Sequence, residues 1–203
     1  MNKTIKKLGV AGVIDLETTG FSPITEEILE LSLVLFSFNY QTGEVIEIVD
    51  EYSGLREPEV PIGRGASRVH GIYKKDVLGM TLDEKRIVTM FDAAEYIIAH
   101  NARFDYSFMI QLSNQLADKP WLCSMNGIGW RKKGLASRAL QYLIEQHGIE
   151  VARKHRARDD AMATLSLISQ QDANSNYYLL ELLRSKPINY ARLAAKEAAA
   201  AAK

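Results

Sequence analysis

The sequence predicts an α/β domain built on a mixed β-sheet, and three observations support this fold class. A strand-like apolar run opens the chain, two β-favouring stretches joined by a turn signal follow, and helix and strand patterns alternate after Thr81. An antiparallel meander followed by βα units is typical of a mixed sheet covered by helices. At 203 residues and 47% hydrophobic content, the chain can bury the core that such a domain needs.

The first three strands are expected near the start of the chain. The first ends at Asp15, within the stretch VIDLETTG at residues 13–20. The second and third flank Gln41-Thr42-Gly43, which reads as the turn of a hairpin. Residues 55–80 contain repeated prolines and glycines, and we expect them to be loop-like.

Helices and a further buried strand are expected in the second half. The apolar run Tyr96–Ala99 predicts a buried strand that ends at His100 and Asn101. Apolar residues at helical spacing predict helices over 103–117, 135–149 and 159–169. Asp105 falls on the inward face of the first of these helices, and Gly148 is a plausible C-cap of the second. The Ala-rich end, residues 193–203, is either a solvated helix or an appended tail.

Composition and charge limit the class of protein. No apolar run approaches the roughly 18 to 20 residues that span a bilayer, so no membrane partner is expected. The one cysteine, Cys123, has no partner for an intrachain disulfide, which favours a cytoplasmic location. Net charge is zero overall, but residues 1–100 carry −6 and residues 101–203 carry +6. The basic second half is therefore the part expected to contact phosphate.

Two carboxylates mark the end of the first expected strand. Residues i and i+2 of a strand point to the same face, so Asp15 and Glu17 would lie side by side. A hard divalent cation such as Mg²⁺ or Mn²⁺ would relieve their repulsion. Alone, however, this pattern is more often an ordinary solvated strand end.

Later acids strengthen the metal hypothesis. Asp105 lies on the packed face of its helix, where an unpaired carboxylate is costly, although the helix dipole also favours an acid there. Asp160 lies where another helix begins and admits the same two explanations. His155, five residues earlier, would be on the approaching loop. Its basic neighbours favour phosphate attraction over a solvated charge run; they are Arg153, Lys154, Arg156 and Arg158.

Three ordered segments carry a family resemblance. DLETTG, AHNARFD and HRARDDA resemble the three motifs of the DEDDh 3′–5′ exonucleases, which include epsilon-type proofreading subunits, RNase T and oligoribonuclease. The resemblance covers roughly residues 8–170. It implies a ribonuclease H-like fold with a five-stranded sheet, three strands antiparallel and then two parallel, flanked by helices. It also implies an exonuclease domain over 1–171 and a C-terminal helical extension over 172–203.

The resemblance implies a role for each matching residue. The catalytic set would be Asp15, Glu17, Asp105, His155 and Asp160. Its four carboxylates would bind two divalent metal ions, Mg²⁺ or Mn²⁺, and His155 would be the general base. The substrate-binding residues would be Leu16, Thr18, Phe21, His70 and Asn101. Many relatives carry Asp-Thr where this chain has Cys123-Ser124, which puts the substrate contact made there in question.

The function implied is metal-dependent 3′–5′ exonuclease activity that releases nucleoside 5′-monophosphates. DNA is favoured, as single strands or frayed ends, because DLETTG and the VHGI around His70 resemble the epsilon type. The alternatives are an RNA 3′–5′ exoribonuclease and a non-catalytic module that binds nucleic acid or a polymerase. Expected partners are nucleic acid with a free 3′ end and a DNA polymerase or repair complex. A homodimer is left open.

Overall fold

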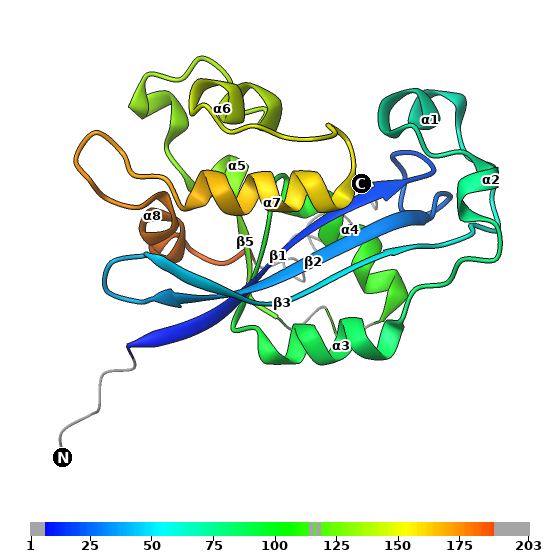
Figure 1. Cartoon of the computed structure of the whole chain (residues 1–203), viewed down its shortest axis with the longest axis horizontal. Helices are drawn as coiled ribbons and strands as arrows, with labels where there is room; N and C mark the ends of the chain where they lie inside the picture. Colours follow the sequence, from blue (N-terminus) through cyan, green and yellow to red (C-terminus); the bar gives the residue numbers. More distant parts are fainter. Residues whose placement is uncertain (1–6, 114–115, 117–118, 189–203) are drawn as a thin grey trace, which may run out of the picture.

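The computed structural model describes residues 7–113, 116 and 119–188, which form a five-stranded sheet with helices on both faces (Figure 1). The strands are β1 Leu8–Thr18, β2 Ile28–Asn39, β3 Val45–Leu55, β4 Tyr96–Ala99 and β5 Trp121–Cys123. The helices are α1 Arg64–His70, α2 Lys74–Val77, α3 Glu84–Ala93, α4 Ala102–Leu112, α5 Ser124–Gly127, the 3-10 helix η2 Trp130–Lys133, α6 Leu140–Gln146, α7 Ala157–Ile168 and α8 Tyr178–Arg184. None of these helices is long and apolar enough to cross a membrane.

The sheet has the predicted composition. Its strand order is β3-β2-β1-β4-β5; β1, β2 and β3 pair antiparallel, and β4 and β5 continue the sheet in parallel with β1. Three antiparallel strands followed by two parallel ones were expected, and this prediction is confirmed. Strand β1 therefore lies in the middle of the sheet, where both of its edges are paired.

The two faces of the sheet are covered by different helices (Figure 1). Alternate residues of β1 enter different cores. Ile14 and Leu16 pack with residues of α3 and α4, whereas Val13 packs with residues of α6, α7 and α8. Asp15 and Glu17 follow Val13 at spacings of two, so their side chains belong to the face that α7 covers.

Three expectations about the helices need correction. Residues 55–80 were expected to be loop-like, but they contain α1 and α2, because the glycines there delimit a helix instead of filling a loop. Gly63 precedes α1 and Gly71 ends it with a left-handed backbone, φ 71°. The helix expected over 135–149 begins only at Leu140, after an extended Ala139, and the helix expected over 103–117 gives way to an extended Ser113.

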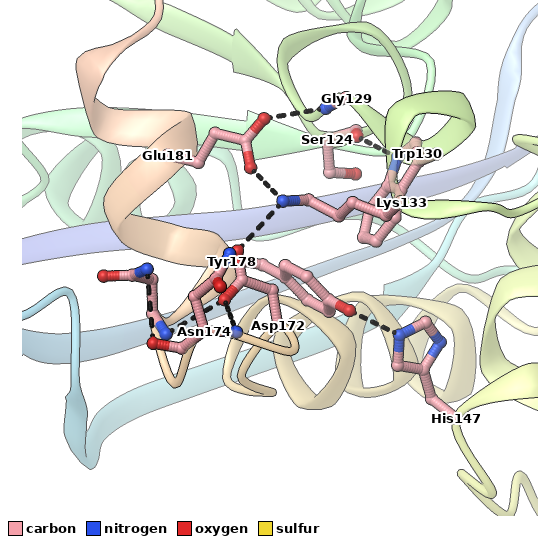
Figure 2. A network of polar contacts seen from close by, with 10 residues as sticks. Ser124, Gly129, Trp130, Lys133, His147, Asp172, Asn174, Tyr178 and Glu181 are labelled. Atoms are coloured by element: carbon pink, nitrogen blue, oxygen red, sulfur yellow. Dashed lines mark hydrogen bonds and ion pairs between the residues drawn. The ribbon is translucent and has the colours of Figure 1, made fainter.

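The segment after α7 joins the core of the domain through α8. Tyr178, Leu179 and Leu182 are buried in the same cluster as Val13 of β1. Polar contacts reinforce this packing: Lys133 Nζ lies 2.8 Å from Glu181 and 3.2 Å from Asp172 (Figure 2). A domain boundary at residue 171 stays a prediction, and the Ala-rich residues 193–203 lie outside the described part.

Candidate metal and nucleic-acid site

The site begins with two acids on the central strand. Asp15 and Glu17 are partly buried, and β2 faces them in register with Ser32 opposite Asp15 and Glu30 opposite Glu17. The register then shifts between Glu17 and Thr18, so the regular ladder is broken directly after the acids. Such irregularities commonly re-aim side chains beside functional sites.

Helix α4 supplies the third acid from the opposite face of the sheet. Asp105 lies in its first turn and is 3% exposed. The residue before the helix, Asn101, has a left-handed backbone with φ 73°, which reverses the chain between β4 and α4. This short connection brings Asp105 to the end of β1, where the backbone N–H of Leu16 hydrogen-bonds its carboxylate.

Helix α7 supplies the fourth acid, and the loop that precedes it supplies the histidine. Asp160 is 6% exposed; its Oδ2 accepts the backbone N–H of His155 at 3.2 Å, and its Oδ1 accepts Gln141 Nε2 at 3.2 Å. His155 also has a left-handed backbone, φ 58°, and its Nδ1 lies 4.0 Å from Asp160 Oδ2. Ligand atoms of Glu17, His155 and Asp160 all lie within 4.8 Å of one another, so β1 and α7 meet in one potential metal site.

The electrostatics show that these acids are crowded. Burial, then repulsion from Asp105, Glu17, Asp160 and Glu30, raises the pKa of Asp15 well above its usual range. Burial, then repulsion led by Asp160, raises the pKa of Glu17 to about 8. Burial also raises the pKa of Asp105 to about 8 and raises the pKa of Asp160. In the described part of the chain, no lysine or arginine forms an ion pair with Asp15, Glu17 or Asp105.

This arrangement fits a divalent cation. Buried like charges without counter-charges are costly, and a bound cation would offset that cost. Carboxylate oxygens and an imidazole nitrogen are donors that bind divalent cations in proteins. The residues that converge are therefore those that a metal site requires.

A fifth acid was missed in the sequence. Glu30 of β2 is 4% exposed and accepts both arms of Arg156, at 2.9 Å from Nε and 2.7 Å from Nη2. It also accepts the backbone N–H of Ala157, the first residue of α7, at 3.0 Å. Glu30 thus fixes the start of α7 between His155 and Asp160. The available signal was a glutamate inside a long apolar strand, EILELSLVLF.

The basic run around His155 is mostly paired with protein acids. Arg158 Nη2 lies 3.0 Å from Glu51, and Arg153 Nε lies 3.5 Å from Asp159, the neighbour of Asp160. Arg156 is paired with Glu30, so each of the three arginines contacts an acidic side chain of the protein. The pairs of Arg153 and Arg158 are solvent-exposed and weak, so the expectation that this run attracts phosphate stays a prediction.

A cleft of about 650 Å³ opens beside Glu17, a volume that suits a nucleotide-sized ligand. Its lining includes every residue predicted to bind substrate: Leu16, Thr18, Phe21, His70 and Asn101. Phe21 is 90% exposed at its rim, and the turn around Thr18 is fixed by a hydrogen bond from its hydroxyl to the Gly20 carbonyl, 2.6 Å. Leu16 is buried and packs in the α3–α4 core while also lining the cleft.

His70 is buried in the wall of this cleft. The residue is 5% exposed, and its Nδ1 accepts the backbone N–H of Ile72 at 3.0 Å. This places the proton on Nε2, which has no hydrogen bond of good geometry among the described residues. Burial lowers the pKa of His70, and the Thr18 carbonyl offsets this only in part, so the environment favours the neutral ring.

Cys123 and Ser124, which stand where many relatives carry Asp-Thr, lie in the interior of the domain. Ser124 is fully buried and its hydroxyl lies 2.9 Å from His100 Nδ1. Burial lowers the pKa of His100 to about 4, and its Nε2 lies 2.8 Å from the Arg138 carbonyl. Ser124 therefore supports the connection after β4 and does not line the cleft.

Comparison with known proteins now identifies the family. The family model RNase_T, described as exonuclease, matches residues 13–168. The chain belongs to the DEDDh-type exonuclease family. The matched range contains all the acids of the site and His155, and the predicted family membership is confirmed.

The similar proteins are nucleic-acid enzymes. The chain is 31% identical over 166 residues to DNA polymerase III PolC-type of Thermotoga maritima, covering 75% of the chain but 11% of that relative. It thus spans about a tenth of the polymerase relatives that it matches. It is also 28% identical over 114 residues to Ribonuclease T of Buchnera aphidicola, covering 48% of the chain and 50% of that protein.

Solved structures share the ribonuclease H-like fold. Exonuclease X in complex with 5′ overhanging duplex DNA aligns with a TM-score of 0.58 and 23% identity, covering 84% of this chain and 99% of that one. The zinc-bound complex of E. coli ExoI with single-stranded DNA aligns with a TM-score of 0.63 and 19% identity, covering 79% and 40%.

Proposed function

We propose that the protein is a metal-dependent 3′–5′ exonuclease that releases nucleoside 5′-monophosphates from nucleic acid with a free 3′ end. The observation that carries this proposal is the meeting of four acids and one histidine at the end of a nucleotide-sized cleft. The acids would hold two ions of Mg²⁺ or Mn²⁺ through Asp15, Glu17, Asp105 and Asp160. When bound, such ions supply Lewis-acid stabilisation of the developing negative charge and favour the ionised nucleophile.

The protein's own residues position the substrate and move the proton. His155 would accept the proton of the attacking water, since imidazole titrates near neutral pH. Asp160 would hold the backbone of His155 in place by accepting its N–H, and Glu30 with Arg156 would hold the start of α7, which lies between His155 and Asp160. The terminal nucleotide would occupy the cleft, with His70 in its wall and Phe21 at the rim available for contact with the base.

DNA is the preferred substrate in this proposal, as single strands or frayed ends. The polymerase relatives and the DNA named with the exonuclease structures support this preference. The second candidate, an RNA 3′–5′ exoribonuclease, rests on the similarity to Ribonuclease T. Work beside a DNA polymerase or repair complex, a cytoplasmic location and a homodimer remain predictions.

A labelled oligonucleotide distinguishes these possibilities. We expect Mg²⁺- or Mn²⁺-dependent release of a labelled mononucleotide from a free 3′ end and none from a 3′-blocked end. Matched single-stranded DNA, duplex DNA and RNA are expected to rank in that order. Absence of metal-dependent release from every free 3′ end would contradict the enzyme proposal and favour a non-catalytic binding module, whereas faster release from RNA would select the second candidate.

A further inference from the structure

We propose that a second cleft, on the far side of α1 from the acids, binds the single strand on the 5′ side of the nucleotide being released. This inference rests on the exonuclease function proposed above. The cleft has a volume of about 540 Å³ and lies between the segment 58–62, helix α1 and the start of α2. Its charged lining consists of Arg64, Arg68, Lys74 and Glu59.

Helix α1 is a wall shared by the two clefts. Residues Ala66, Val69 and His70 of α1 line the catalytic cleft. Arg64 and Arg68, spaced by four, line the second cleft. Residues three or four apart share a helical face, so these two sets project from opposite sides of α1. A strand that leaves the catalytic cleft over α1 would therefore meet the two arginines.

The cations of the second cleft have no protein partner. Arg64, Arg68 and Lys74 are exposed and form no ion pair or side-chain hydrogen bond with the described residues. The arginines beside His155 are different, because each of them is paired with an acid. Against the one acid of the lining, Glu59, three free cations leave the second cleft positive. Unneutralised cations in a groove are what a phosphate backbone requires.

An aromatic ring adds a contact that free phosphate alone would not use. Tyr73 lines the cleft beside Lys74 and is 52% exposed. Exposed aromatic rings beside cations are typical of sites that stack bases of single strands without reading their sequence. The second cleft therefore fits a nucleotide of the strand rather than an isolated anion.

The width of α1 determines how many nucleotides are needed to reach from the catalytic cleft to the second cleft. An α-helix with its side chains is about 10 to 12 Å across. At a rise of about 3.4 Å per stacked nucleotide, crossing it takes roughly three nucleotides. Oligonucleotides of three nucleotides would end before the second cleft, whereas a 12-mer would fill it.

Substrate length provides the test. Steady-state kinetics would be measured on thymidine oligonucleotides of three and twelve nucleotides, over a range of NaCl concentrations. The triple variant R64A/R68A/K74A would be compared with the parent and with the control K85A/R131A/K132A. The control removes the same charge from exposed residues, on α3 and η2, that line neither cleft. Unfolding temperatures would show that both variants fold.

We expect the parent to have a lower KM for the 12-mer than for the trimer, and the R64A/R68A/K74A variant to lose this preference. Its KM for the 12-mer would rise about tenfold or more, and the dependence of log KM on log salt would flatten by about 2, given a slope near 0.7 per phosphate contact. The control would keep the preference of the parent.

Three results would overturn the second cleft: no length preference in the parent, a preference retained by R64A/R68A/K74A, or an equal loss in the control. A different result addresses the proposed function. If the parent releases no nucleotide from either oligonucleotide with metal present, the exonuclease proposal itself fails.

Discussion

Two polar clusters of this molecule differ in how their charges are paired. In the network around Lys133, each charge meets an opposite charge or a backbone donor (Figure 2). There, backbone N–H groups of Asn176 and Asn174, together with Lys133, lower the pKa of Asp172. At the acid site, like charges face one another and the pKa values of Asp15, Glu17 and Asp105 rise instead.

The difference separates a structural polar cluster from a functional one. The Lys133 network ties α8 to η2 and needs nothing further. The acid site destabilises the metal-free protein, because it lacks the positive charge that would satisfy it. Changes in the first cluster should therefore alter stability, and changes in the second should alter activity.

The largest effect is expected from Asp15→Asn, which removes one charge without changing the size of the side chain. Release of the 3′ nucleotide should fall about a thousandfold or more, since several kcal/mol of transition-state stabilisation depend on the metal site. The unfolding temperature of the metal-free variant should rise, because one repelling charge is gone. Nuclease assays and thermal unfolding in EDTA measure both, and a variant that is inactive only because it is less stable than the parent contradicts the comparison.

Glu30→Gln should have the next largest effect, because it breaks the clamp that holds the start of α7. We expect kcat to fall about 10- to 100-fold, as for residues that orient metal ligands, with KM changed less than about threefold. The matched control is Glu51→Gln, which removes the exposed partner of Arg158. This change should lower kcat less than twofold. Equal losses in both variants would show that Glu30 has no positioning role.

The stability of the metal-free protein should depend on pH in a direction opposite to that of most proteins. The pKa values of Glu17 and Asp105 are raised to about 8, so the folded state holds these protons more tightly than the unfolded state. The contribution of these two groups to the free energy of unfolding is complete below about pH 4 and is lost as the pH rises through 8. Unfolding temperatures in EDTA should fall between pH 6 and 9, and Mg²⁺ should restore them. A curve that is flat in EDTA and unchanged by Asp15→Asn would refute this account.

Lys133→Met should lower stability and leave the chemistry intact. It leaves Asp172 and Glu181 without their shared cation, and we expect the unfolding temperature to fall by about 3 to 6 °C, the pair being partly exposed. The kcat at 20 °C should stay within twofold of the parent. Lys132→Met, its exposed neighbour, is the control and should change neither quantity.

The smallest effect is expected from Tyr178→Phe. It removes the hydrogen bond between the tyrosine hydroxyl and His147 Nε2, 2.9 Å, while keeping the ring against Trp130. A loss of about 1 kcal/mol, or roughly 2 to 4 °C in the unfolding temperature, should follow. Thermal unfolding measures it, and a loss as large as that of Lys133→Met would show that the ring packing was disturbed.

Much of the fold follows from local pattern in the sequence. The alternation around VIDLETTG and the turn at Gln41-Thr42-Gly43 set the antiparallel strands, because side-chain period and turn chemistry are local properties. Helix α1 was missed, since glycines at both of its ends resemble those of a loop until the backbone of Gly71 is known. Short helices depend on tertiary packing more than on propensity.

In the candidate site, too, some residues could be predicted from sequence motifs and others depend on contacts made only in the folded chain. The ordered motifs indicate Asp15, Asp105 and Asp160, and these stay predictions of function that the geometry supports. The role of Glu30 could not be predicted, because it depends on Arg156, a residue 126 positions away in the chain. The free cations of the second cleft were hidden for the same reason: pairing of charges is a property of the folded chain.

The central position of β1 has a consequence for amide hydrogen exchange. Val13 is paired with both β2 and β4, so its amide should exchange only when the whole domain opens, whereas Asp15 and Glu17 are paired with β2 alone and should exchange through smaller openings of the strand end. His155 follows the exposed residues Ala152 to Lys154 and should exchange through local opening. The acids of β1 would then keep their places when the segment before α7 opens, while His155, the proposed general base, could adjust to each substrate without unfolding anything else.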